Sequence, residues 1–318
     1  MKKILKKLLD STALTEDLYK KLRYYYAKSK LSIPDEEYAT EYYYQKFGRR
    51  LDLKNPTTFD EKVWWLKFHY HNDLLTQCAD KFAVREYVEK CGLSHILNEL
   101  YCVYDNVDDI DINKLPERFY LKCNHVSGGN VACFDKAQFN FAKAKRKLKW
   151  YMGINQYCIT REWQYKNIAP KIVAEKFLEN KDKTPLIDYK FYCFHGKPVM
   201  LLIMSGTVKC DGTHQDEKYA FENYYDIDLN PLGIVDDSRI MDESKVRIPI
   251  NYKKMVEYAG ILSKPFPFVR VDFYEIDSQI IFGELTFTCA GGCHNYKPER
   301  YHNILGSYLD LTKVKRQG

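Results

Sequence analysis

The sequence predicts an α+β fold in which helices come first and antiparallel hairpins follow. From residue 1 to about residue 110, apolar side chains recur with the period of a helix. Three later segments instead alternate apolar and polar side chains, and each turns back on itself as a hairpin does. Strands and helices do not follow a regular β–α–β order, which argues against a doubly wound parallel sheet. We therefore expect separate α+β lobes.

The size and composition are those of a globular protein. The 318 residues are enough for about two structural units, and no apolar run approaches the roughly 20 residues of a membrane-spanning helix. Lys6 and Asp10 interrupt the apolar N-terminus, so we expect no signal peptide and a cytoplasmic protein. The ten cysteines form no CxxC pair and are expected to be reduced thiols. Cys289, Cys293 and His294 lack the second ligand pair of a zinc site.

The net charge of +6 lies in the first 30 residues, which hold nine basic and three acidic side chains. The rest of the chain has 49 − 9 = 40 basic and 43 − 3 = 40 acidic residues, a balance that argues against a nucleic-acid-binding protein. Residues 1–34 are expected to form a basic amphipathic helix. Its apolar face, formed by Ile4, Leu5, Leu8 and Leu9, suits either an anionic membrane surface or packing on the body. The sequence does not indicate an oligomeric state.

Residues 35–114 are expected to be mostly helical. In NPTTFDEKVWWLK, a proline and a threonine precede acidic residues, which predicts a helix from about Thr58. Gly92 is placed to end the last of these helices.

The remainder is expected to contain three hairpins and two helices. The predicted elements are a hairpin at 118–135, a helix at about 137–151, a strand in KIVAEKFLE, a hairpin turning at His195 to Lys197, a helix in YKKMVEYAGILSK and a hairpin ending in FGELTF. A polar, acidic stretch from about 207 to 250 carries no chemistry that we can name.

The last hairpin carries the most informative polar residues. Strand alternation places Arg270 and Asp272 on one face of FVRVDF, and Glu284 and Thr286 together in FGELTF. With a turn near residues 275–279, both pairs can share one face of the ribbon. Two neighbouring carboxylates repel each other unless a cation lies between them, and their hard oxygens suit Mg²⁺. The alternative is a solvated sheet face with incidental charges.

The first hairpin offers a complementary feature. Lys122 alternates with apolar residues in the strand that leads into the loop at residues 125–130. Adjacent Gly128 and Gly129 let backbone N–H groups approach phosphate oxygens, and the lysine adds a positive charge. An ordinary hairpin turn explains the two glycines equally well.

The order of these segments resembles that of the ATP-grasp superfamily. The series is Asp80-Lys81, LKCNHVSGG, IVAEKFLE, DYKFYCFHGKP, VRVDF and GELTF. Together with NPTTFDEKVWWLK, it is similar to the TupA-like ATP-grasp family of bacterial surface-polysaccharide (teichuronopeptide) biosynthesis, over residues 35–310. The resemblance implies an ATP-grasp fold whose two lobes, residues 115–180 and 181–318, hold the nucleotide between them.

The resemblance implies ATP and Mg²⁺ as cofactors and a role for each matching residue. The residues expected to bind the nucleotide are Lys81 and Lys122 at the phosphates, Ser127, Gly128 and Gly129 in the phosphate loop, Glu175, Lys176, Phe177 and Leu178 at the adenine, Glu179 at the ribose, and Asp188 and Lys190 at the floor of the cleft. The expected catalytic cations are Arg270, Lys122 and Lys190, and the expected metal ligands are Asp272, Glu284 and Thr286. Thr286 departs from the asparagine common in this position, which puts a second metal ion in doubt.

The implied reaction is amide formation. ATP phosphorylates a carboxylate, here that of a uronic acid, and an amino acid or another amine attacks the acylphosphate. The segment AGGCHNYKP is expected to border the acceptor, with His294 and Lys297 as candidate contacts. The alternatives are a sugar kinase, a glycosyltransferase that uses Asp226 and Asp228 as an Asp-x-Asp motif, and a binding module that has lost activity.

Overall fold

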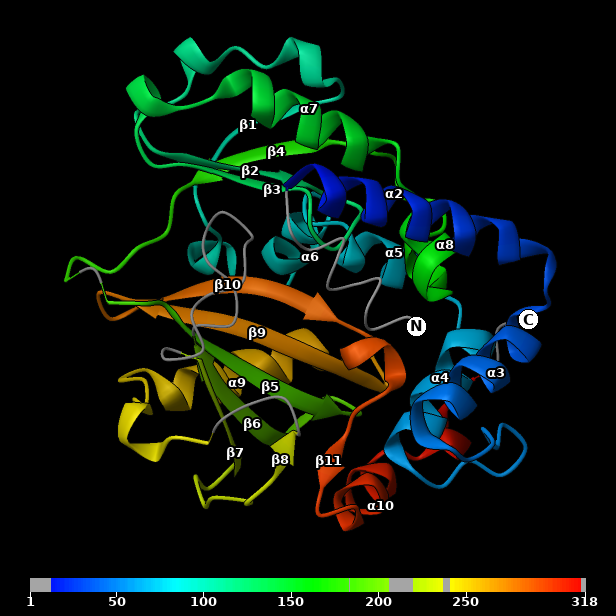
Figure 1. Ribbon diagram of the computed structural model, residues 1–318. Helices are drawn as coiled ribbons and strands as arrows, with labels where there is room; N and C mark the ends of the chain where they lie inside the picture. Colours follow the sequence, from blue (N-terminus) through cyan, green and yellow to red (C-terminus); the bar gives the residue numbers. More distant parts are fainter. Residues whose placement is uncertain (1–12, 183, 206–219, 237–240, 316–318) are drawn as a thin grey trace.

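The computed structural model describes residues 13–182, 184–205, 220–236 and 241–315. It contains two antiparallel sheets with helices packed on them, which confirms the predicted α+β class (Figure 1). The predicted apolar face at Ile4 to Leu9 lies outside the described residues. No helix within the described ranges is long and apolar enough to cross a membrane.

The N-terminal region is mostly helical, as predicted, but residues 100–104 within it form a strand that pairs with residues 172–175. Its helices are α2 (Ala13–Ser29), α3 (Asp35–Phe47), α4 (Phe59–His69), α5 (Asp73–Ala79) and α6 (Val84–Lys90). α4 begins with a capping box, in which the Thr58 hydroxyl accepts from the Glu61 N–H and the Glu61 carboxylate accepts from the Thr58 N–H at 3.0 Å. The helix start predicted at Thr58 is therefore confirmed. Gly92, two residues beyond α6, has a φ of 78°.

The first sheet has the strand order β1-β4-β2-β3. Its strands are β1 (Leu100–Tyr104), β2 (Phe119–Cys123), β3 (Asn130–Cys133) and β4 (Ile172–Lys176). The predicted hairpin at 118–135 is the β2–β3 pair. Helix α7 (Phe141–Met152) packs on the sheet through Leu148, which shares a core with Leu121 and Ile172. Helix α8 (Gln156–Thr160) follows.

The second sheet has the order β10-β9-β5-β6-β7. Its strands are β5 (Ile187–Phe194), β6 (Lys197–Ser205), β7 (Phe221–Asp226), β9 (Phe268–Ile276) and β10 (Gln279–Thr286). The hairpins β5–β6 and β9–β10 confirm the two later hairpin predictions. β8 (Val235–Asp236) pairs with β11 (Tyr296–Lys297), and helices α9 (Tyr252–Ser263) and α10 (Arg300–Tyr308) complete the fold.

The two faces of the second sheet have different roles. One face is apolar and packs on α9, because Phe191, Val271 and Phe273 share a core with Met255 and Ala259. The other face is apolar along β6, where Met200, Leu202 and Met204 are buried, and at one end of β5 and β9. At that end, Phe194 and Phe268 meet Phe59 of α4, at ring-centroid distances of 5.8 and 4.9 Å.

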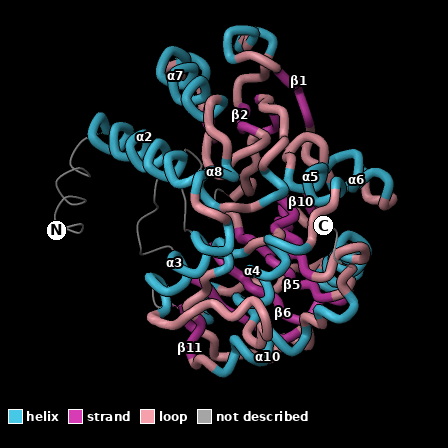
Figure 2. Tube along the Cα trace, turned by 90° about the vertical axis from the view of Figure 1, so that its right-hand side faces the viewer, coloured by secondary structure: helices cyan, strands magenta, loops and turns pink. Residues whose placement is uncertain are grey.

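The remaining part of that second face is polar. It carries Asp188, Lys190, Arg270 and Asp272, which occupy alternate positions on β5 and β9. The β9–β10 hairpin lies between the first sheet and the rest of the second sheet (Figure 1), and the view turned by 90° shows β10 below β2 and beside α5 (Figure 2). The fold therefore places the polar residues of the two sheets in the same region of the molecule.

Candidate active site

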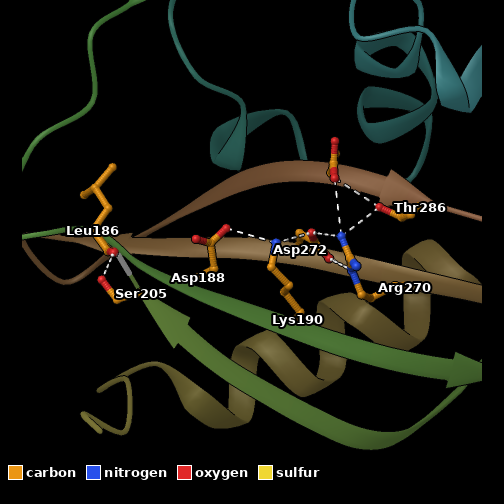
Figure 3. A network of polar contacts seen from close by, with 8 residues as sticks. Leu186, Asp188, Lys190, Ser205, Arg270, Asp272 and Thr286 are labelled. Atoms are coloured by element: carbon orange, nitrogen blue, oxygen red, sulfur yellow. Dashed lines mark hydrogen bonds and ion pairs between the residues drawn. The ribbon is translucent and has the colours of Figure 1, made fainter. Parts of the chain in front are cut away.

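The polar face of the β9–β10 hairpin is organised around Arg270. Its guanidinium donates to both oxygens of Asp272, with Nε–Oδ1 and Nη2–Oδ2 distances of 2.7 and 2.6 Å. The same Nη2 atom lies 3.0 Å from the Thr286 hydroxyl and 3.4 Å from the Glu284 carboxylate. Thr286 in turn donates to Glu284 at 3.1 Å. The four residues predicted to share a face therefore form one network (Figure 3).

Lys190 of β5 extends this network. Its ammonium lies 2.7 Å from Asp272 and 3.1 Å from Asp188 (Figure 3). Burial alone would raise the pKa of Asp272, but Arg270 and Lys190 hold that pKa below its usual value. Burial would likewise lower the pKa of Lys190, but Asp188 and Asp272 raise it. Both groups therefore stay charged, and positive and negative side chains alternate across β5 and β9.

A β-bulge directs Glu284 onto this face. Phe282 pairs with Phe273 and Glu284 pairs with Asp272, so Gly283 is the extra residue in β10. Phe282 is buried in the apolar core, whereas the Glu284 side chain is 49% exposed. In a regular strand these two side chains would point to the same face, since they are two residues apart. The bulge lets Phe282 point into the core while Glu284 points to the polar face.

The first sheet contributes a second ion pair. The Lys122 ammonium lies 2.7 Å from the carboxylate of Glu175, and these residues come from the adjacent strands β2 and β4. Burial alone would raise the pKa of Glu175, but the charge and hydrogen bond of Lys122, together with Arg85 and Asn98, lower it. Lys122 is thus held in place at the root of the glycine-bearing loop.

That loop is bound to the Asp80-Lys81 motif. The Lys81 ammonium donates to the Val126 carbonyl at 2.6 Å, and the Asn124 amide donates to Asp80 at 2.9 Å. The backbone N–H of Lys81 also donates to the Asn124 carbonyl at 3.1 Å. Two segments that are separate in the sequence thereby form one rigid unit. Ser127 at its tip is exposed.

Gly128 and Gly129 have φ angles of 95° and 65°, which other residues rarely adopt. A Cβ atom on Gly129 would lie 2.9 Å from the Tyr151 Cβ atom. Glycine is therefore required here both for the backbone conformation and for the close approach of α7.

The first half of the site, which comprises Lys81, Lys122 and the loop that Lys81 binds, interacts electrostatically with the second half, on the β9–β10 hairpin. Burial lowers the pKa of Lys81, and the strongest opposing influence is the charge of Glu284 on the other sheet. Lys81 of the first half and Glu284 of the second thus lie within reach of each other's charge.

The residues predicted at the adenine follow β4. Lys176 is exposed, and its backbone N–H donates to the Glu99 carbonyl. Phe177 is buried, and the Arg118 guanidinium lies over its ring, 4.7 Å from the ring centroid. Leu178 is half-buried, and Glu179 forms an ion pair with Arg118. These side chains lie together at one end of the first sheet, beyond the Lys122–Glu175 pair.

Sequence reasoning missed a second pair of buried charges, Lys67 of α4 and Glu162. Lys67 lies 3.3 Å from the centroid of the Trp64 ring and donates to the Gly291 carbonyl at 3.4 Å, and Glu162 accepts from Gln164 at 3.1 Å. Burial lowers the pKa of Lys67 to about 8, although the charge of Glu162 opposes it. Burial raises the pKa of Glu162 to about 7, although Lys67 opposes it, and the charge of Glu284 adds to the increase.

His294 has a structural role and is not exposed to an acceptor. It is 3% exposed, and its Nδ1 atom lies 2.7 Å from Asp60, which is fully buried and also 3.0 Å from His302. Burial would raise the pKa of Asp60, but the two histidines lower it to about 2. The earlier expectation that His294 contacts the acceptor is therefore wrong. Lys297 is exposed on β11.

The two other motifs considered from the sequence also have a definite structure. Asp226 accepts from the backbone of Asp228 and Asn230, so it forms a turn at the end of β7, and β5 and β6 separate β7 from β9. Cys289 is buried, Cys293 is half-buried, and the nine cysteines within the described residues are free thiols. Across that same part of the chain, no group of three or more His, Cys, Asp or Glu side chains is arranged to hold a metal ion.

Two α+β lobes that bring a glycine-rich loop with its lysines opposite a pair of strand-borne carboxylates define an ATP-grasp protein. The model of the TupA-like ATP-grasp family matches residues 61–310, and the chain belongs to that family. No curated protein matches the sequence.

Solved structures of ligases resemble the chain distantly. The D-alanine–D-alanine ligase of Bacillus anthracis, complexed with ATP, is 13% identical, with 67% of this chain and 55% of the ligase covered and a TM-score of 0.39. The L-amino acid ligase of Bacillus licheniformis is 15% identical, with 81% and 56% covered and a TM-score of 0.44. The chain thus spans little more than half the length of these two enzymes.

The donor set is compatible with Mg²⁺ and a nucleotide phosphate. Asp272, Glu284 and Thr286 offer only oxygen atoms, which Mg²⁺ prefers. The cation that touches both carboxylates is the Arg270 guanidinium, so a metal ion is not needed to relieve their repulsion. Among the residues that the structure describes, the half-exposed Glu284 side chain is bonded through Oε1, which leaves its second oxygen available for a metal ion.

Proposed function

We propose that this protein is an ATP-dependent carboxylate–amine ligase. The observation that carries the proposal is that the charge of Glu284, a member of the Arg270–Asp272–Glu284 network, acts on Lys81 of the opposite half. Lys81 also binds the glycine-bearing loop that follows Lys122. A set of fixed cations opposite two carboxylates suits phosphoryl transfer, in which the protein mainly positions groups and neutralises charge. Family membership supports the use of ATP.

Each group has a defined task in this mechanism. Lys122 and Lys81 bind phosphate oxygens, and the backbone of the Ser127–Gly129 loop closes over them. Asp272, Glu284 and Thr286 would hold Mg²⁺, which would supply positive charge to neutralise the phosphates. Arg270 stabilises the phosphoryl group as it moves from ATP to the substrate carboxylate, after which an amine displaces phosphate to form the amide. Lys190 keeps Asp272 ionised and oriented.

We further propose a uronic acid of a bacterial surface polysaccharide as the carboxylate substrate and an amino acid or a related amine as the second substrate. The support is the TupA-like character of the chain, since the resemblance to that family implies polysaccharide biosynthesis. Such a reaction consumes ATP and therefore belongs on the cytoplasmic side of the membrane.

The test is to incubate the full chain with MgATP and pools of uronic acids and amines, and to measure ADP and phosphate. We expect ADP release that requires both substrates. ADP release without an amine, together with a phosphorylated acceptor, would identify a kinase instead. Turnover only with nucleotide sugars would identify a glycosyltransferase, and MgATP binding without any turnover would identify a binding module.

Variants test the assignment of the site. Lys122→Ala and Glu284→Gln should each abolish ADP release, because each removes a charge that faces the phosphates. Glu299→Gln, an exposed change of the same chemistry on the α10 side, should leave the rate unchanged. A double variant Asp272→Asn, Glu284→Gln with full activity would disprove the metal assignment.

A further inference from the structure

Helix α2 carries an apolar stripe that is largely exposed, although the Tyr25 ring also lies 6.3 Å from that of Trp150. Leu22, Tyr25 and Tyr26 are 57%, 58% and 65% exposed, and they lie on one helical face because they are separated by three and four residues. Large apolar side chains at helical spacing normally pack into a core. These three instead form a continuous exposed surface together with Ser29.

The opposite side of α2 holds the helix on the body. Tyr24 is 6% exposed, its hydroxyl accepts from the Asn155 N–H at 3.2 Å, and its ring packs edge-on against Trp150 at 5.9 Å. Figure 2 shows α2 along the outer edge of the molecule, beside α7 and with α8 at its inner end. The helix is therefore anchored through one face, and its apolar stripe is exposed on another.

Basic residues flank the stripe on both sides. Arg23 and Lys30 lie to one side of it, and Lys21 and Lys28 lie to the other. From Tyr19 to Leu31 the chain has five basic residues and no acidic one. The first acidic residues beyond α2 are those of the first turn of α3, where Asp35 is already paired with the buried Arg161. The basic surface therefore covers α2 and the turn after it, and the neighbouring helix α7 adds exposed Lys143, Arg146 and Lys149.

This arrangement indicates the chemistry of the partner. Tyrosine favours the boundary between water and hydrocarbon, because its ring is apolar and its hydroxyl is polar. Lysine and arginine beside an apolar stripe add attraction to anionic headgroups. The cations on both flanks of the stripe are complementary to an anionic surface, whereas an apolar groove would leave them without a partner.

We infer that the exposed face of α2, formed by Leu22, Tyr25 and Tyr26 and flanked by Arg23 and Lys28, docks the protein on the surface of an anionic membrane. The helix lies parallel to the surface, and the three apolar side chains enter the headgroup region. The inference does not depend on the proposed reaction, since none of these residues belongs to the site described above.

The experiment is flotation of the full chain with vesicles of phosphatidylcholine alone or with one quarter phosphatidylglycerol. We expect binding to the anionic vesicles at low salt and loss of most of it at high salt, because salt screens the charges. The variant Leu22→Ser, Tyr25→Ser, Tyr26→Ser and the variant Arg23→Glu, Lys28→Glu should each weaken binding by about tenfold or more.

Matched controls isolate the α2 face. Tyr44→Ser changes another half-exposed tyrosine, and Lys253→Glu, Lys254→Glu reverses two exposed charges on α9, so both variants should bind as the unmodified chain does. Thermal unfolding verifies that each variant is folded. If the serine variant does not fold, the charge variant still tests the inference, because it leaves the apolar stripe unchanged. The inference would be overturned if the chain bound neutral and anionic vesicles equally well, or if both α2 variants bound anionic vesicles as strongly as the unmodified chain. Concentration-dependent dimerisation that the serine variant abolishes, without vesicle binding, would assign the face to a second copy of the chain instead.

Discussion

Glu284 stands directly opposite Asp272 in the β9–β10 hairpin because Gly283 is inserted between Glu284 and the buried Phe282. Because of this insertion, Phe282 faces the apolar core and Glu284 faces the candidate site, although both belong to β10. A Cβ atom on Gly283 would lie 3.0 Å from the Asp272 carbonyl oxygen, so the two strands are as close here as a glycine allows.

Gly283→Val should therefore misplace Glu284 without removing it. The new side chain pushes β10 away from β9, and we expect kcat to fall by about tenfold to a hundredfold, as small displacements of catalytic groups do. The measurement is ADP release at saturating MgATP, with thermal unfolding to verify the fold. Gly260→Ala is the control, because its nearest neighbour would be at an ordinary 3.7 Å. Unchanged kcat in Gly283→Val would show that the bulge does not position Glu284 for the reaction.

Thr286 links Arg270 to Glu284 through a single hydroxyl. Thr286→Val keeps the shape of the side chain but removes this link, and hydrogen bonds to charged groups contribute about 1.5–3 kcal/mol. We expect the Mg²⁺ concentration for half-maximal activity to rise by about tenfold or more. Thr286→Ser retains the hydroxyl and should behave like the unmodified chain. The same Mg²⁺ dependence in all three proteins would leave the hydroxyl without a role in metal binding.

Local patterns in the sequence predict much of this site. Strand alternation alone places Arg270 beside Asp272 and Glu284 beside Thr286, and the structure joins all four in one network. The start of α4 follows from its capping residues, which act within a few positions of each other. Features of this kind are predictable because each depends on neighbours in the chain.

Features that depend on distant contacts are not visible in the sequence. β1 lies within a region that reads as helical and becomes a strand by pairing with β4. Lys67 resembles any helical lysine until folding buries it near Glu162. His294 resembles an acceptor contact until Asp60 of α4 is placed against it. In each case tertiary packing decides the outcome.

Gly129 and Gly48 form a natural pair for testing the phosphate loop. Their φ angles are 65° and 67°, but a Cβ atom on Gly129 would meet Tyr151 at 2.9 Å, whereas nothing lies within 4 Å of one on Gly48. Both alanine variants incur the left-handed strain of about 1–2 kcal/mol. Gly129→Ala should cost about 1–3 kcal/mol more from overpacking and should weaken MgATP binding. Urea unfolding and nucleotide titration measure the two effects; equal losses in both variants would contradict the steric argument.

Lys67 and Glu162 should make stability depend on pH near neutrality. The pKa of Glu162 is raised on folding to about 7, so its contribution to stability is complete below its unfolded value and is lost as the pH rises through 7. The pKa of Lys67 is lowered on folding to about 8, so its contribution is present only above its unfolded value and is lost as the pH falls through 8. Between these values both groups are charged and buried, and both reduce stability.

The double variant Lys67→Met, Glu162→Gln removes both buried charges and should be more stable than the unmodified chain at pH 7.5, by an amount of order 1–4 kcal/mol. The advantage should shrink at pH 5, because Glu162 in the unmodified chain is then protonated and only Lys67 remains unfavourable. Urea unfolding of both proteins at the two pH values measures the difference. The single variant Glu162→Gln is the control: it leaves Lys67 buried without its counter-charge, so it should be less stable than the double variant. A double variant less stable than the unmodified chain at pH 7.5 would mean that the attraction between the two charges exceeds the cost of burying them.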